Sequence, residues 1–252
     1  MSTDKLATVE KNIALEPAPS YFKKDDRRGF EDTLQTDLMI PRLALAQALS
    51  PQVTEGDPNR IEGLKPGDLW NSVTSQNYGK EVRIQLLRKM PLRAMEFRSV
   101  DDGGGVVDPD VPMGDPRLAW GTSGDKKADK PKATLFRDFI AVVLPQREII
   151  ALSFKSSGIK AAKALWGLAT MRNKPVFAGC YVITTGTELK PKPHSVFKVA
   201  NAGWVSEADA KLGEEMFEAV QTIDATKIHR ESGDDPDDFE PSKMEGGPAT
   251  DM

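Results

Sequence analysis

The order in which β-rich and helical stretches follow one another constrains the fold more than any other feature of the sequence. Five runs rich in β-branched, aromatic or alternating apolar residues predict strands, at residues 82–97, 134–144, 148–155, 176–184 and 195–200. Only three residues separate the second run from the third, which predicts a hairpin. Consecutive strands joined by short links favour antiparallel pairing, so this order argues against a doubly wound parallel sheet.

Two stretches have the helical period instead. Residues 158–171 place apolar side chains from Ile159 to Ala169 on one stripe. A second helix is expected to start at Ser206, where a hydroxyl can cap the first turn and Asp209 occupies the third helical position. The first helix therefore falls between the third and fourth strands, and the second follows the last strand.

We expect an α+β fold that is mainly β. A five-stranded oligonucleotide-binding (OB) barrel has a helix between its third and fourth strands, so the predicted architecture is an OB-like barrel with one interstrand helix and a C-terminal helix. An α+β sandwich with the same element order is the alternative. Residues 69–70 predict a short additional strand, and Pro41 leaves residues 37–52 open between an edge strand and a helix starting near Pro41.

The chain of 252 residues is long enough to bury a sizeable core. We expect a single domain at residues 29–230, between a disordered N-terminal arm at 1–28 and a disordered tail at 231–252. We expect a long basic loop at residues 99–133, rich in Gly, Pro, Asp and Lys, to interrupt the domain. The apolar runs are far shorter than a membrane span and the N-terminus does not resemble a secretory signal, so we expect a cytoplasmic protein without membrane contact.

Charge is distributed unevenly along the chain. Residues 231–252 hold eight acidic residues and one lysine, a net charge of −7, whereas the whole chain has −4, so the remainder carries +3. Within that remainder, residues 80–199 hold 21 Lys and Arg against 12 Asp and Glu. A basic body with an acidic tail indicates either a polyanion-binding protein or a soluble domain with a solvated end.

The sequence offers little for catalysis. Phosphate-binding loops, nucleophile elbows and paired metal-binding histidines are absent, and Cys180, the single cysteine, is interpreted as a small core residue. Aspartates 101, 102, 108 and 110 lack the spacing of a calcium loop, which favours a solvated loop. We therefore predict a protein that is not an enzyme and that has no cofactor and no metal site.

Residues suited to binding single-stranded nucleic acid are better represented. Such binding needs cations that displace counterions from phosphates, and aromatic faces on which bases stack. The chain interleaves both kinds across the predicted strands and the long loop. The candidate binding residues are Arg83, Arg88, Lys89, Arg93, Phe97, Arg98, Trp120, Lys126, Lys127, Phe136, Arg137, Lys155, Tyr181, Lys198 and Trp204.

The tail contains an acidic segment with one aromatic residue. Its candidate partner-binding residues are Asp234, Asp235, Asp237, Asp238 and Phe239. A mobile arm of net charge −7 can occupy a basic groove when DNA is absent and become available to proteins when DNA displaces it. A tail that only aids solubility is equally compatible with this composition.

The basic strands, the interstrand helix, the long loop and the Asp-Asp-Pro-Asp-Asp-Phe tail together resemble the single-stranded DNA-binding proteins encoded by tailed bacteriophages. The resemblance spans residues 67–239 and rests on architecture and charge; the terminal Gly-Pro-Ala-Thr-Asp-Met departs from the bacterial tail, which ends in Phe. It implies a protein that coats single-stranded DNA in the bacterial host cytoplasm and contacts replication or recombination proteins through its tail.

Two further functions are weighed against single-strand binding. One is a non-enzymatic protein-interaction or assembly module, such as a phage structural or host-takeover factor. The other is a small nuclease that uses the aspartates with magnesium, for which no motif exists. Basic and aromatic side chains that converge on one concave face of a sheet would favour DNA binding, and dispersed ones would favour the interaction module.

Overall fold

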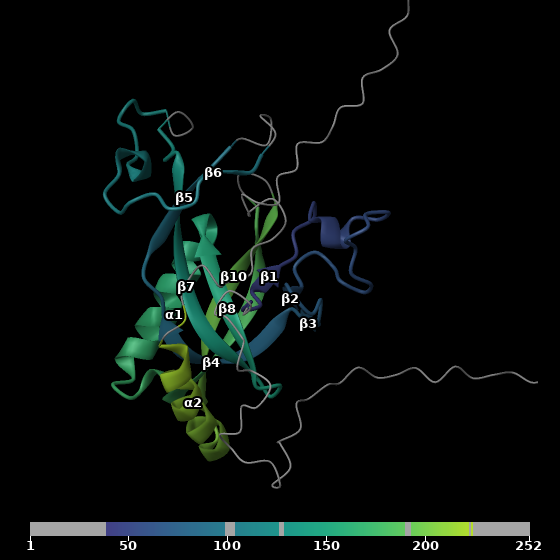
Figure 1. Cartoon of the computed structure of the whole chain (residues 1–252). Helices are drawn as coiled ribbons and strands as arrows, with labels where there is room; N and C mark the ends of the chain where they lie inside the picture. Colours follow the sequence, from purple (N-terminus) through teal and green to yellow (C-terminus); the bar gives the residue numbers. More distant parts are fainter. Residues whose placement is uncertain (1–38, 99–103, 126–128, 190–192, 222, 224–252) are drawn as a thin grey trace, which may run out of the picture.

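The computed structural model describes residues 39–98, 104–125, 129–189, 193–221 and 223, which form a mainly β, α+β structure with two antiparallel sheets. Figure 1 shows β7 near the middle of the larger sheet, α1 and α2 toward the lower left of the view and the smaller sheet toward the right. The larger sheet has the order β10-β9-β4-β7-β5-β6, with β8 on the other edge of β7. The strands and helices are β1 (Leu43–Leu45), β2 (Leu69–Asn71), β3 (Asn77–Gly79), β4 (Glu81–Lys89), β5 (Arg93–Phe97), β6 (Val106–Asp108), β7 (Ala133–Leu144), β8 (Glu148–Lys155), α1 (Ile159–Met171), β9 (Gly179–Glu188), β10 (His194–Trp204) and α2 (Glu207–Val220).

The stretch predicted as one strand at 82–97 is two strands, because Pro91 interrupts it. Pro91 has no backbone N–H for a ladder, and residues 90–92 lie outside any strand. Both halves then pair with the same strand: β4 lies against residues 139–144 of β7, and β5 lies against residues 133–136. β7 therefore has two successive partner strands, β4 and β5, where the sequence predicted one.

The predicted hairpin is present, and the last two predicted strands also pair with each other. β7 and β8 pair from Phe136↔Lys155 to Val143↔Glu148, and β9 pairs with β10 along most of its length. The fourth predicted strand begins later than expected, at Gly179, because residues 176–178 form a 3-10 turn. In β9 a Cβ at position 179 would lie 2.4 Å from Tyr181 Oη, so only glycine fits there.

The two helices pack on opposite faces of the larger sheet. α1 contributes Ala162, Leu165 and Ala169 to a core with Ile84 and Leu86 of β4. α2 packs on the other face with Val220, where Leu87 and Val142 are buried. Ser206 caps α2 as predicted, since its Oγ accepts a hydrogen bond from the Asp209 N–H. Within the described residues, neither helix is long and apolar enough to cross a membrane.

The larger sheet does not close into a barrel, so the five-stranded OB barrel is not confirmed. No backbone ladder joins β8 to β10 among the described residues. The segment around β1, left open by the sequence, is a strand; it meets β8 through the bridge Arg42↔Ala151 and meets β10 through the side chain of Gln47. That amide donates to Ser195 O and accepts from Ser195 N, both at 2.9 Å. The Arg42↔Ala151 bridge and the Gln47 side chain thus connect the β1 segment to β8 and β10, where a closed barrel would have a backbone ladder between those two strands.

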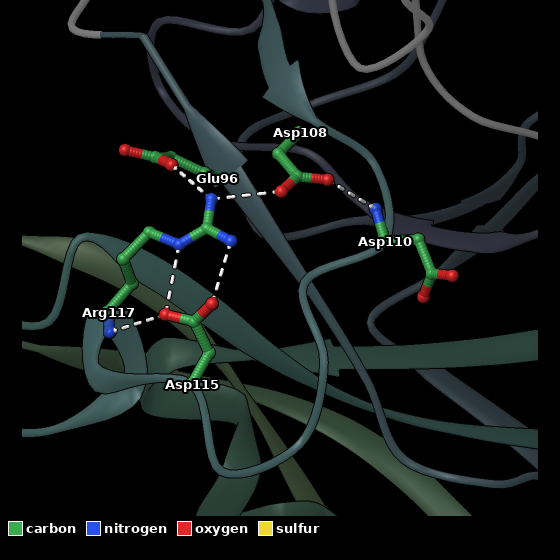
Figure 2. Close-up of polar contacts among 5 residues, drawn as sticks. All are labelled: Glu96, Asp108, Asp110, Asp115 and Arg117. Atoms are coloured by element: carbon green, nitrogen blue, oxygen red, sulfur yellow. Dashed lines mark hydrogen bonds and ion pairs between the residues drawn. The ribbon is translucent and has the colours of Figure 1, made fainter.

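The segment predicted as a structureless loop at 99–133 contains regular structure where it is described. β6 pairs with β5, and residues 116–118 form a 3-10 turn. Figure 2 shows Arg117 at the centre of this segment, bonded to Glu96 at 2.8 Å, to Asp108 at 2.9 Å and to Asp115 at 2.8 Å. Because Glu96 belongs to β5, Arg117 ties the segment to the sheet.

Candidate nucleic-acid interface

Four of the predicted binding residues come together where β5, β7 and β8 lie side by side. The register Arg93↔Phe136↔Lys155 aligns three of them on one face, and Phe97 lies beside Phe136 with ring centroids 6.1 Å apart. Lys155 Nζ lies 5.3 Å from the centre of the Phe97 ring, and Arg93 Cζ lies 4.3 Å from that of Phe136. We name Arg93, Phe97, Phe136 and Lys155 the β5–β8 aromatic cluster.

A buried carboxylate lies beside this cluster, on the same face of β7. Asp138 is fully buried and accepts hydrogen bonds from Arg93 Nε at 2.5 Å and from Ser153 Oγ at 2.6 Å. Arg93 therefore forms an internal ion pair with Asp138, and this pair holds its guanidinium over the Phe136 ring. Phe136 is also buried, whereas Phe97 is half-buried. Lys155 is exposed, and so is Arg98, the residue after Phe97. Phe97 and Lys155 are thus the members that a ligand can reach.

A second cation–aromatic group forms at the end of α1. Arg172 Cζ lies 4.5 Å from the ring centre of Trp204 and 5.0 Å from that of Tyr181. Its guanidinium donates to Asn201 Oδ1 and, at 3.4 Å, to Cys180 O. Trp204 is 60% exposed, but Tyr181 is fully buried, so only Trp204 offers a face for stacking. Arg172 was not among the binding residues predicted from the sequence. The one sequence feature that could have indicated it is its position directly after the predicted helix.

Two further predicted cations hold the fold together. Arg88 Nη1 donates to the carbonyl oxygens of Val220 and Ile223, each at 2.8 Å, and so caps the C-terminal end of α2. Lys89 Nζ lies 5.2 Å from the ring centre of Trp166 on α1. Both side chains are half-buried, so neither belongs to an open groove.

The remaining described candidates are scattered. Arg83 and Lys198 are both exposed. They lie on the same face of the sheet, because their partners on β9, Val182 and Thr184, are two residues apart. Arg137 is half-buried on β7, and Trp120 is 65% exposed in the segment after β6. The described candidates therefore come from several elements and from both halves of the larger sheet, and a single binding groove stays a prediction.

The long loop is also not basic as a whole. Residues 99–133 hold seven Asp against five Lys and Arg. Two of its described carboxylates are engaged within the protein: the Arg117 guanidinium lowers the pKa of Asp115 to about 2 through hydrogen bonds, and Asp108 accepts a hydrogen bond from Asp110 N. No group that could hold a metal occurs among the described residues. Lys126, Lys127 and the tail residues Asp234, Asp235, Asp237, Asp238 and Phe239 lie outside them.

Cys180 lies in the core as expected. Its side chain is buried on β9, and desolvation raises the pKa of its thiol. A thiol with a raised pKa has little thiolate at neutral pH, so it is a poor nucleophile.

A cavity of about 370 Å³ lies beside the β5–β8 aromatic cluster, in the gap that β1 bridges between β8 and β10. We name it the β1–β8–β10 cavity. Its polar lining consists of two cations, one amide and five serines: Arg42, Lys155, Gln47, Ser50, Ser153, Ser156, Ser157 and Ser195. Lys155 belongs both to this lining and to the aromatic cluster. No sequence pattern groups these residues, because they come from three distant segments.

Comparison with protein-family models matches residues 9–226 to the family described as Pam3 phage gp34-like protein. The chain belongs to this family. The family's description supports the expected phage origin and states no activity. Comparison with curated proteins and with solved structures yields no match.

Proposed function

We propose that this member of the gp34-like family binds and protects single-stranded DNA without sequence preference during phage replication or recombination, and that it does so without catalysis or a cofactor. The β5–β8 aromatic cluster carries the proposal. It presents a half-buried ring, Phe97, next to an exposed ammonium group, Lys155, and this pairing suits a base that stacks while its phosphate is neutralised. Because the β1 segment contacts both β8 and β10, an OB-like architecture remains part of this proposal.

Mutations at the cluster test this directly by fluorescence anisotropy of a labelled oligothymidine at low and moderate salt. Phe97→Ala should weaken binding by about 1 to 3 kcal/mol, the contribution of one stacked base. Lys155→Gln should reduce the slope of log K against log salt by about one, because one fewer phosphate is neutralised. Lys160→Gln removes the same charge from an exposed position on α1 and should change neither quantity.

One observation favours a second function. The dispersed candidates and the exposed Trp120 and Trp204 are the pattern expected of a non-enzymatic protein-interaction or assembly module. If full-length protein and a chain ending at Arg230 both fail to bind oligothymidine at low salt, single-strand binding is refuted and this module becomes the working function.

A further inference from the structure

A groove of about 490 Å³ lies along the C-terminal half of α1. It is lined by Trp166, Ala169 and Thr170 of α1 and by residues 173–176, and we name it the α1 groove. Trp166 is its largest side chain. The Trp166 ring packs near the ring of Phe139, with ring centres 6.3 Å apart, and 37% of the residue stays exposed. An apolar side chain that enters the groove would therefore be sheltered from water against an indole that is already held in place.

The segment that forms the groove carries only positive charge. Residues 156–187, all of which the structure describes, contain no Asp or Glu and hold the cations Lys160, Lys163, Arg172 and Lys174. Lys174 lines the groove, and Lys163 lies on the same side of α1 as Trp166, three residues before it. Both lysines are exposed, and neither ammonium group contacts another described residue. The groove thus combines an aromatic face with positive charge, which suits an acidic segment that contains an aromatic residue.

The described part of the chain ends beside this groove. Ile223, the last described residue, accepts a hydrogen bond from Arg88 of β4 at 2.8 Å. Lys89 is the next residue of β4, and its Nζ lies 5.2 Å from the centre of the Trp166 ring. Phe177, directly after the groove lining, packs against a phenylalanine ring of α2. Two consecutive residues of β4 thus contact the end of the described chain and the groove.

The sequence after Ile223 contains a segment of matching chemistry. Residues 234–239 are Asp-Asp-Pro-Asp-Asp-Phe, which supply four carboxylates and one aromatic ring. The ten residues at 224–233 span at most about 35 Å when extended, which is longer than two neighbouring side chains of one strand. A segment on such a tether is present at a high effective concentration, so weak contacts suffice to hold it.

We propose that residues 234–239 dock in the α1 groove of the same chain. The Phe239 ring packs against Trp166, and the carboxylates lie beside Lys163 and Lys174. This docking gives the acidic tail a defined position on the body, which its charge alone leaves open. It does not require that the protein binds DNA.

Paramagnetic relaxation in the full-length chain tests the docking. A nitroxide attached at Ser242→Cys lies three residues after Phe239, and Cys180 is buried, so the label attaches at position 242. The label should broaden the NMR signal of the Trp166 indole N–H, whereas the indole signal of Trp70, which is buried in the smaller sheet, should stay sharp.

Variants at both ends of the contact identify the groups that hold the tail. Phe239→Ala should lower the docking equilibrium constant by more than about tenfold, because the ring no longer buries its surface. Lys163→Gln combined with Lys174→Gln should lower it by about two- to tenfold. The matched control combines Lys130→Gln with Lys132→Gln, which removes two exposed charges outside the groove lining and should leave the broadening unchanged.

Three results would overturn the proposal. The first is a Trp166 signal that the label leaves sharp at low salt. The second is broadening that persists unchanged in Phe239→Ala and in the Lys163 and Lys174 variant. The third is broadening that occurs when an isotope-labelled chain without nitroxide is mixed with a nitroxide-labelled chain, and that is lost when the doubly labelled chain is diluted with unlabelled protein. A second copy would then be the occupant. None of these measurements uses oligothymidine, so failure of the proposed DNA binding leaves this test unaffected.

Discussion

Several arginines of this protein connect parts of the fold, although the sequence presents them as free charge. Arg88 holds the end of α2, Arg93 holds the buried Asp138, and Arg117 holds three carboxylates. A planar guanidinium with five donors suits such internal contacts, whereas an ammonium group is more strongly hydrated. Counting basic residues in residues 80–199 therefore overstates the charge available to a polyanion.

The Arg93–Asp138 pair makes a prediction at this scale. Asp138→Ala should lower the free energy of unfolding by about 3 to 5 kcal/mol, because it leaves a guanidinium with 15% exposure without its counter-charge. Urea unfolding followed by circular dichroism measures the change. The surface pair Lys211–Glu207 serves as control, since Glu207→Gln should cost no more than about 0.5 kcal/mol. Equal effects of the two variants would refute the structural role of Asp138.

Among the elements, those made by pairing with distant segments depart furthest from sequence expectation. β4 and β5 share one partner strand although Pro91 separates them, and β6 exists through its pairing with β5. The segment that carries β6 is fixed by the contacts of Arg117 with three carboxylates and by Val111 and Leu118, which pack in a cluster with Ala94 of β5. Part of its order therefore depends on the ionisation of a few carboxylates.

The pH dependence of this segment follows from the Asp115 carboxyl. Hydrogen bonds from Arg117 hold its pKa at about 2 in the folded protein, below its ordinary 3.8. A lowered folded-state pKa contributes stability above the ordinary value, which is lost as the pH falls toward 2. Hydrogen exchange of residues 106–119, corrected for intrinsic rates, should show protection at pH 5 that decreases toward pH 2.

Removal of the guanidinium provides the comparison for that experiment. Arg117→Gln should raise exchange in residues 106–119 at neutral pH and leave β7 protected, because β7 lies in the apolar core. Protection in the variant that matched the wild type across this pH range would show that Arg117 does not anchor the segment.

At the scale of the whole molecule, the described body carries the binding candidates and the acidic tail adds the opposing charge. If the tail competes with DNA for the body, a chain ending at Arg230 should bind oligothymidine several-fold more tightly at low salt than the full chain. The difference should shrink as salt rises, because screening weakens contacts between exposed charges. Anisotropy measures both affinities, and equal affinities at low salt would leave the tail with a solubility role.

The sequence by itself determined the local elements: the β7–β8 hairpin, both helices, the Ser206 cap and the α+β class. Periodicity and capping depend on residues a few positions apart, so they can be read along the chain. It also selected Phe97 and Lys155, because a basic and an aromatic residue recurred on predicted strands.

Only the tertiary structure decided which of the basic and aromatic side chains contact one another and which form internal contacts that stabilise the fold. The link between the β1 segment and β10 depends on Gln47 reaching Ser195, and the β1–β8–β10 cavity depends on three segments that lie far apart in sequence. The burial of Tyr181 and Phe136 and the pairing of Arg93 with Asp138 likewise arise from packing. Contacts of this kind leave no period in the sequence, because each joins one residue to another at a separation that only the folded chain sets.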